Sequence, residues 1–488
     1  MKTTCDLTSV LRGGVNPLCK RQAFRERRSD VKGVGFLTGA MRLFALAAIS
    51  LAATSAMAAA NYWKGADGAD LAVAANWTES ALPTSDAGYI NGRAEHGTDF
   101  TATLSGNLSL YQLIWGGNNP VARSTVLDLG GNTLTLTVVS SARPIRIEED
   151  DQSVTITNGT VTFSSTETAL LLGNNETLTL GEGLIFNGYA ALNGAAARSG
   201  NTIVVKDGAK VNGKLDIAAY QTGGTILVTG DGTEVAYGSV QFKLPTATTS
   251  SNSVFRVADG ATVNTGSGQN AQVANNGETE MELSVESGAT FKTGDNAVDS
   301  GKWLCLGKSG VVGGNKISVG DEATIQTRVF QAVGTGNTVA ISNGTFTVGA
   351  YAQFGRSATD AITLKFAGSS PHLHVVSTTH ETALFAGTPT LVFDIPAEGY
   401  TTIPITRGNS IEIPDTAQLV VNARDYVRAG GGTLTLMSVT GSNKTLTAPE
   451  TLLTRWNAEL GSTANVSVVD GNKLVLTVKQ PGLTIIFK

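Results

Sequence analysis

Cysteine is scarce in this chain, with three residues among 488. Only Cys305 lies beyond residue 58, so the part of the chain after residue 58 can form no intrachain disulfide. This excludes the small secreted modules that disulfides hold together, and it requires stability from a core and from hydrogen-bonded ladders. We expect Cys305 itself to be a small buried core residue.

Proline and charge are also scarce, with 12 prolines and 15% charged residues. Only Pro245 falls between residues 145 and 370, which favours ladder strands there because proline cannot donate a backbone hydrogen bond. Glycine is abundant, with 57 residues, as in chains that turn often. No segment has the pattern of a long amphipathic helix, and residues 449–460 are the best short candidate. The composition predicts an all-β protein.

Basic residues are concentrated at the start of the sequence. Residues 1–58 hold nine Lys or Arg and three Asp or Glu, which leaves 26 basic and 37 acidic residues beyond. The remainder carries about −11 charges, which argues against nucleic acid as a partner.

Residues 41–58 read MRLFALAAISLAATSAMA, a single arginine, an apolar stretch and a small-x-small end. This is the pattern of an export signal, and we interpret residues 1–58 as a basic leader and signal peptide. An uncleaved anchor and a twin-arginine route through Arg27-Arg28 are the alternatives, and translation could start at Met1 or at Met41. After cleavage we expect no transmembrane segment, and we place the protein at the cell surface or outside the cell, with the periplasm as the alternative.

Strand-turn-strand phrases recur along the middle of the chain. NTIVVKDGAKVNG (201–213) has alternating apolar residues on both sides of Asp-Gly, which by itself predicts a hairpin. Related phrases precede and follow it, and from the first of them their turns are 24, 25, 24, 28 and 28 residues apart, with a final double step of 56 whose middle member has Glu322 in place of glycine. The turn glycines that mark these steps are Gly159, Gly183, Gly208, Gly232, Gly260, Gly288 and Gly344.

A constant step favours stacked coils over independent hairpins, because each coil must lie against the next to satisfy its backbone groups. A third apolar phrase between successive units, for example WLCLG at 303–307, completes about three strands for every ~25 residues. The glycines then lie at coil corners, where a positive φ is required.

The sequence therefore predicts an all-β parallel β-helix of ~25-residue coils with β caps at both ends. Five prolines interrupt the repeat after residue 370, and three of the five tryptophans precede residue 120. We expect a Trp-rich N-terminal cap at 59–120, β-helix repeats at 121–370 and a C-terminal β region at 371–488.

The opening NYWKG…ANW…LP…D of residues 61–86, the V-x-D-G-A-x-V coils and the GTLTLM…KLVLTV ending resemble bacterial autotransporter passengers and related surface proteins with β-strand repeats. The resemblance covers most of residues 60–488. It implies a right-handed parallel β-helix at the cell surface or outside the cell. The residues after 370 are too few for the C-terminal transmembrane barrel that commonly follows such passengers, so a separate chain could serve as translocator.

Two groups of residues could bind a ligand. Trp63, Trp77 and Trp115 are better explained as large side chains of an end cap, and sugar stacking on their flat faces is the functional alternative. His372 and His374 alternate on one strand and could bind zinc with His380 or Glu381, or they are exposed residues at the Pro371 boundary.

Catalytic patterns are weak. The densest acidic run, Glu148 to Asp151, is better explained by a solvated loop than by a glycosidase pair, and no acidic cluster repeats in phase as a calcium-dependent lyase would need. We expect no cofactor and no catalysis, and predict a structural or adhesin-like element whose partner is an extracellular polysaccharide or a cell-surface protein. The alternative is a polysaccharide-binding or polysaccharide-degrading module on the same fold.

Overall fold

The computed structural model describes residues 61–90, 99–116, 124–138, 143–164, 168–192, 197–217, 221–237, 243–244, 250–266, 270–294, 298 and 302–479. All of these residues belong to one compact unit, Ala60–Lys488. The expected leader and signal peptide, residues 1–58, lies outside the described residues.

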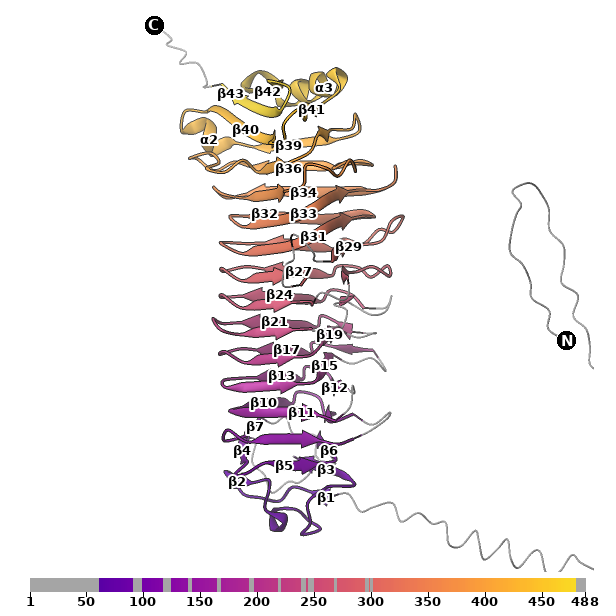
Figure 1. The fold of residues 1–488 in the computed structure, drawn as a ribbon, viewed down its shortest axis with the longest axis vertical. Helices are drawn as coiled ribbons and strands as arrows, with labels where there is room; N and C mark the ends of the chain where they lie inside the picture. The colour runs from indigo at the N-terminus through magenta and orange to yellow at the C-terminus, as the bar shows by residue number, and fades with distance from the viewer. Residues whose placement is uncertain are drawn as a thin grey trace, which may run out of the picture. The chain divides into compact units, whose positions relative to one another are not determined.

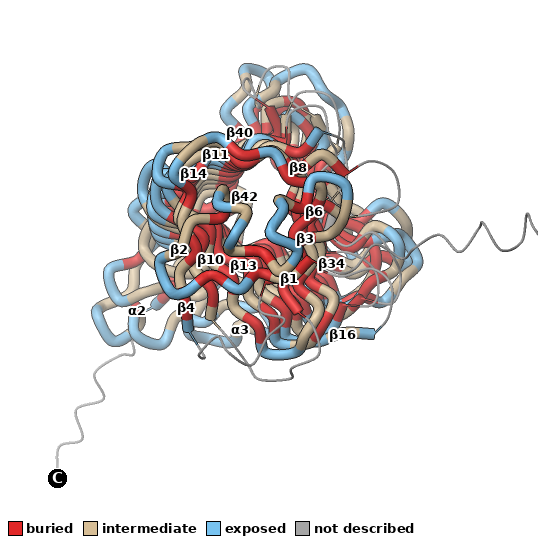
Figure 2. Tube along the Cα trace, turned by 90° about the horizontal axis from the view of Figure 1, so that it is seen from below, coloured by how far each residue is buried: buried red, intermediate tan, exposed pale blue. Residues whose placement is uncertain are grey.

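The described residues form a parallel β-solenoid of about 12 turns. Figure 1 shows the coils stacked along one axis, and Figure 2 shows that the coils have three sides, each with buried residues along it. The parallel β-helix predicted from the sequence is confirmed.

Three ladders of strands run along the solenoid, and we call them the first, second and third faces. The first face is β2 (Ala69–Asp70), β4 (Asp99–Thr103), β7 (Ser124–Asp128), β10 (Ser153–Thr157), β13 (Thr177–Leu180), β17 (Thr202–Val205), β21 (Thr225–Thr229), β24 (Val254–Ala258), β27 (Glu282–Val285), β30 (Lys316–Val319), β32 (Thr335–Ser342), β34 (Ala361–Ala367), β36 (Thr390–Asp394) and β39 (Gln418–Asn422). The second face is β5 (Leu108–Leu110), β8 (Thr133–Leu136), β11 (Gly159–Phe163), β14 (Leu184–Asn187), β18 (Lys210–Asn212), β22 (Glu234–Ala236), β25 (Thr262–Asn264), β28 (Thr290–Lys292), β31 (Thr324–Ala332), β33 (Thr345–Phe354), β35 (His372–Val375), β37 (Ile405–Arg407) and β40 (Gly432–Val439).

The third face is β1 (Asn61–Tyr62), β3 (Ala87–Ile90), β6 (Gln112–Trp115), β9 (Ile145–Ile147), β12 (Thr168–Leu171), β15 (Tyr189–Leu192) and β19 (Leu215–Ile217), followed by β23 (Lys243–Leu244), β26 (Ala271–Val273) and β29 (Trp303–Leu306). β29 then pairs with the second half of β31, whose first half pairs with β28. The long strands β31 and β33 therefore belong to the second and third faces at once.

The coil length follows from the register of the first face. Ser153 pairs with Thr177, Thr177 with Thr202 and Thr202 with Thr225, so successive coils take 24, 25 and 23 residues. The strands on either side of Asp207-Gly208, β17 and β18, pair with neighbouring coils and not with each other. The Asp-Gly turn is thus a solenoid corner, as the constant spacing predicted, and not a hairpin tip.

The corners use glycine for two different reasons. Gly208 has the expected positive φ of 78°, and so do Gly183, Gly232, Gly260 and Gly288. At the Asn-Gly corners the positive φ belongs to Asn158 and Asn343 instead, and the glycines Gly159 and Gly344 meet the preceding coil. A Cβ at Gly159 would lie 2.4 Å from the carbonyl oxygen of Asn132. The positive φ predicted for Gly159 and Gly344 was therefore wrong, and close backbone approach explains them.

The core is a set of columns of inward side chains, because alternate residues of each strand point to opposite sides. On the first face one column runs from Ile156 through Leu180 and Val205 to Phe366 and Phe393, all of them buried. The rings of Phe366 and Phe393 stack at 5.4 Å, one coil apart. Figure 2 shows this buried lining on all three sides of the coil.

The parallel ladders continue beyond residue 371, where the prolines interrupt the sequence repeat. Pro371, Pro389 and Pro404 stand immediately before β35, β36 and β37, a position at which a strand tolerates proline. Residues 371–488, which we expected to close the array, therefore contribute further coils before the strand direction changes.

The last described segment differs from the coils. β43 (Lys473–Val478) pairs antiparallel with β40 and with β42 (Ala464–Val469). α3 (Glu450–Leu460) confirms the one short helix predicted from the sequence, and its Trp456 Nε1 donates to Ala417 O at 3.1 Å. The remaining short elements are η1 (Ala74–Asn76), β16 (Arg198–Ser199), β20 (Gln221–Thr222), β38 (Ile411–Glu412), α2 (Arg424–Arg428), β41 (Leu446–Thr447) and η2 (Gly461–Thr463). Of the helices in the described ranges, none has the length and apolar character needed to cross a bilayer.

Candidate functional site

The outward side of the first face changes in character along the solenoid. In its first half hydroxyl side chains align from coil to coil, as in the column Thr177, Thr202 and Thr225. In β27 and β30 this column holds the charged residues Glu282 and Lys316, and a shallow hollow of about 500 Å³ opens over the strands from β24 to β32. We give the name charged hollow to the six polar lining residues that are linked by contacts, which are Arg256, Glu282, Ser284, Glu286, Lys316 and Ser318.

Strand alternation and register place these side chains together. Leu283 and Val285 of β27 are buried, which leaves Glu282 and Ser284 pointing outward. In the ladder, Glu282 stands opposite Lys316, and Ser284 lies between Arg256 and Ser318. Residues from three successive coils therefore meet at one place on the surface.

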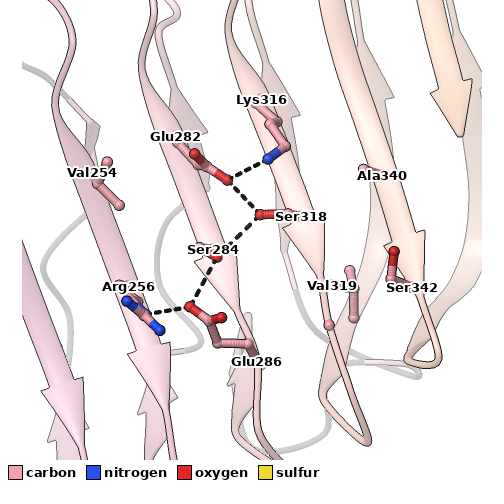
Figure 3. A pocket seen from close by; sticks show the side chains of 11 residues that line it. Val254, Arg256, Glu282, Ser284, Glu286, Lys316, Ser318, Val319, Ala340 and Ser342 are labelled. Atoms are coloured by element: carbon pink, nitrogen blue, oxygen red, sulfur yellow. Dashed lines mark hydrogen bonds and ion pairs between the residues drawn. The ribbon is translucent and has the colours of Figure 1, made fainter. Parts of the chain in front are cut away.

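A chain of polar contacts links the two carboxylates (Figure 3). Lys316 Nζ lies 2.9 Å from Glu282 Oε1, and Arg256 forms an ion pair with Glu286. Ser318 Oγ donates to Glu282 Oε1 at 2.6 Å and lies 3.1 Å from Ser284 Oγ, which in turn donates to Glu286 at 3.4 Å. Each carboxylate has one cationic partner, so the hollow is polar without net charge.

We expect the charged hollow to tie neighbouring coils together only weakly. A double-mutant cycle with Glu282→Gln and Lys316→Met should give a coupling energy of roughly 0.2–1 kcal/mol in chemical denaturation, because both side chains are partly exposed to water. A coupling above about 2 kcal/mol would contradict this and would indicate a desolvated pair.

Trp63, Trp77 and Trp115, the candidates for sugar stacking, are fully buried. The rings of Trp63 and Trp77 meet edge to face at 5.4 Å, and Trp77 Nε1 donates to Leu71 O at 3.0 Å. Trp115 lies in β6 between Ile90 and Ile147 of the adjacent coils. These rings belong to the core, and a sugar has no access to them in this structure. The end-cap interpretation of residues 59–120 stays a prediction.

His372 and His374 lie side by side on the outward side of β35, as their spacing predicted. Their rings stack at 5.3 Å, and His372 Nε2 lies 2.9 Å from Thr406 Oγ1. Partial burial lowers the pKa of both imidazoles. The ring of His380, a suggested third ligand, lies 5.9 Å from that of Tyr351 instead. No trio of His, Cys, Asp or Glu suited to a metal ion occurs among the described residues.

The acidic run that follows Arg146 is used inside the corners. Glu148 forms an ion pair with Arg146, and burial raises its pKa. Asp150 Oδ1 accepts a hydrogen bond from the backbone N–H of Asn174 at 2.8 Å, and Asp151 Oδ1 accepts one from Asn175 Nδ2 at 3.0 Å. The two aspartates thus join one corner to the equivalent corner of the next coil.

A buried carboxyl occupies the position just before a first-face strand. Glu176 is fully buried, and burial together with the charge of Asp150 raises its pKa to about 9, while the backbone of Gly173 and the charge of Arg198 oppose the rise. Its backbone N–H donates to Asn201 Oδ1 at 2.9 Å. Glu176 is therefore neutral at physiological pH.

An outward aromatic pair on the third face was not anticipated. Trp303 is 38% exposed, and its ring meets that of Tyr351 edge to face at 5.8 Å. Cys305, expected in the core, lies on the same outward side and is half-buried, and burial raises the pKa of its thiol to about 11. The signal for both was the alternation in WLCL, where Leu304 and Leu306 take the inward positions.

Comparison of the chain with protein-family models, with curated proteins and with solved structures finds no match.

Proposed function

We propose that this chain is an exported, non-catalytic surface or extracellular protein whose solenoid serves as a structural or adhesive element. The observation that carries the proposal is the uninterrupted parallel ladder of about 12 turns, which holds long outward faces at a fixed spacing. Repeated hydroxyl and amide side chains on such faces offer many weak contacts, and their combined strength can be large when they act together.

The proposed location rests on sequence features. Residues 41–58 have the pattern of an export signal, and the coils and both ends of residues 60–488 resemble autotransporter passengers and related surface proteins. A passenger-like role with a separate translocator follows from that resemblance. The proposed partner is an extracellular polysaccharide or a protein of a cell surface.

The proposal of a non-catalytic role is supported by how the acidic side chains are used. Glu282 and Glu286 are each held by a cation, and Asp150 and Asp151 hold corner hydrogen bonds. A glycosidase instead needs one carboxyl free to protonate the leaving group and a second one across a cleft.

The test is incubation of the purified protein with whole cells and with a panel of plant, bacterial and host polysaccharides, with retention and released reducing sugar measured together. We expect retention of the protein on one polysaccharide or on whole cells, and no sugar release. Ile185→Ala, a change at an exposed apolar residue, serves as the control variant. If both the unaltered protein and this variant release reducing ends, the non-catalytic proposal is overturned and a polysaccharide-degrading module is favoured.

A further inference from the structure

The outward side of β26, β29, β31 and β33 carries two parallel columns of unlike chemistry. The first column is Trp303, Val329 and Tyr351, and the second is Gln272, Cys305, Gln331 and Gln353. Together they form a surface that we call the aromatic–amide platform, made of Trp303, Tyr351, Gln272, Gln331 and Gln353. The platform is separate from the charged hollow, which lies on the first face and shares no residue with it.

The aromatic column is well ordered by its own contacts. Trp303 and Tyr351 stand two coils apart, and their rings meet at 82° over Val329, which is only 5% exposed. The ring of His380 also lies 5.9 Å from that of Tyr351. Trp303 thus keeps a large exposed surface while its neighbours fix its position, as a preorganised stacking surface requires.

The amide column lies beside it. Gln331 Nε2 donates to Gln353 Oε1 at 2.8 Å, which fixes the orientation of both amides. That hydrogen bond leaves the carbonyl oxygen of Gln331 and the amide nitrogen of Gln353 to a ligand, one acceptor and one donor on adjacent coils. Neighbouring hydroxyls of a sugar ring can both donate and accept, so they match this pair.

We propose that the aromatic–amide platform binds a polysaccharide chain, with one pyranose ring stacked on Trp303 and the hydroxyl edges of the next rings along the chain on Gln331 and Gln353. A sugar ring has an apolar C–H face and a polar rim of hydroxyls. The platform matches them with an aromatic column for the face and an adjacent amide column for the hydroxyls. Coils repeat about every 4.8 Å, close to the length of one sugar residue in an extended glycan. A chain lying along the solenoid would therefore place successive sugar residues over successive coils, with Trp303 and Tyr351 two coils apart.

This inference rests on the adhesive role proposed above, to which it assigns a ligand class and a place. The shared chemistry is the pyranose ring, which neutral glycans and uronic acid polymers both supply. Affinity electrophoresis of the full chain in gels that contain hydroxyethyl cellulose, xylan or polygalacturonate separates these sources.

We expect the unaltered protein to be retarded by at least one of the three polymers. Trp303→Ala should weaken that binding about tenfold or more, and Gln353→Ala about threefold or more, whereas Trp303→Phe should keep part of it. Ile185→Ala is the matched control, because it removes another apolar side chain, on β14, that is 40% exposed. This variant should bind as the unaltered protein does. Cooperative thermal unfolding of each variant checks the fold, and Gln353→Ala keeps the test valid if Trp303→Ala fails to fold.

The outcomes separate the two proposals. Retardation that Trp303→Ala and Gln353→Ala leave unchanged would overturn the platform but not the adhesive role. No retardation by any of the three polymers, with adherence to whole cells retained, would overturn the glycan inference alone. If the unaltered protein is neither retarded by a polymer nor adherent to whole cells, the adhesive role is overturned as well.

Discussion

Gly213→Ala is expected to lower the free energy of unfolding by roughly 3 kcal/mol or more. A Cβ at position 213 would lie 1.8 Å from the carbonyl oxygen of Gly188 in the preceding coil, far inside the contact distance of the two atoms. Gly188 has no room to retreat, since a Cβ on that residue would itself lie 2.6 Å from the ring of Phe163 one coil further back. Three successive coils are therefore packed against one another at this corner.

Two other glycines provide the controls for Gly213→Ala. Gly106 has open space around its missing side chain and an ordinary φ, so Gly106→Ala should change stability by no more than about 0.5 kcal/mol. Gly208 also has open space but a φ of 78°, so Gly208→Ala should cost about 1 kcal/mol through backbone strain alone. Chemical denaturation of the three variants ranks the effects, and equal losses at positions 213 and 106 would refute the close packing of the corner.

Glu176→Gln is expected to stabilise the protein above neutral pH. The folded state raises the pKa of Glu176 from 4.5 to about 9, so it binds a proton that the unfolded state has released between these values. The stability that this group contributes is fully present below pH 4.5 and falls as pH rises, by about 1.4 kcal/mol per pH unit, until pH passes about 9. Glutamine has the same shape without the proton to lose, so at pH 8 the variant should be more stable by about 2 kcal/mol or more.

The structural reason lies in the repeat itself. Gln152 and Asn201 hold the same position in the preceding and following coils, one residue before a first-face strand, and both are buried amides. Asn201 Nδ2 donates to Gly173 O at 2.9 Å in addition to accepting from Glu176. A protonated Glu176 replaces an amide in this column, whereas an ionised one would bury a charge.

Unfolding measured in denaturant between pH 5 and pH 9 tests the effect of Glu176. Other titrating groups change the stability of the unaltered protein and of the variant alike, so the difference between them isolates position 176. Glu182→Gln, which makes the same change of side chain at an exposed corner six residues along, is the matched control. Parallel curves for Glu176→Gln and the unaltered protein would show that the carboxyl ionises in the fold without cost.

The solenoid could be predicted because its geometry repeats in the sequence. Asp207-Gly208 alone indicates a hairpin, and only the constant step to Gly183 and Gly232 requires that strands pair between coils. The loss of that step after residue 371 was misleading, because Pro389 and Pro404 stand just before strands and leave the ladders intact. Periodicity thus determined the fold class, but not how far the coils extend.

The side chains were harder to place because pleating decides which of them face water. Trp63 and Trp303 are the same residue type, yet the first is buried and the second exposed, since a shift of one residue along a strand reverses the side. Side-chain contacts between coils are harder still to predict from sequence. His372 contacts Thr406 across 34 residues, and Trp303 contacts Tyr351 across 48. The register that joins such pairs depends on every corner and insertion between them.

The two strands that span two faces, β31 and β33, have a mechanical consequence. Each coil is held by backbone hydrogen bonds to the coil before it and the coil after it. A force applied at one end should therefore detach the coils one after another. Where a strand continues around a corner, as from Thr324 to Ala332, two faces would have to open together. The β31–β33 region is therefore where peeling from either end should stall.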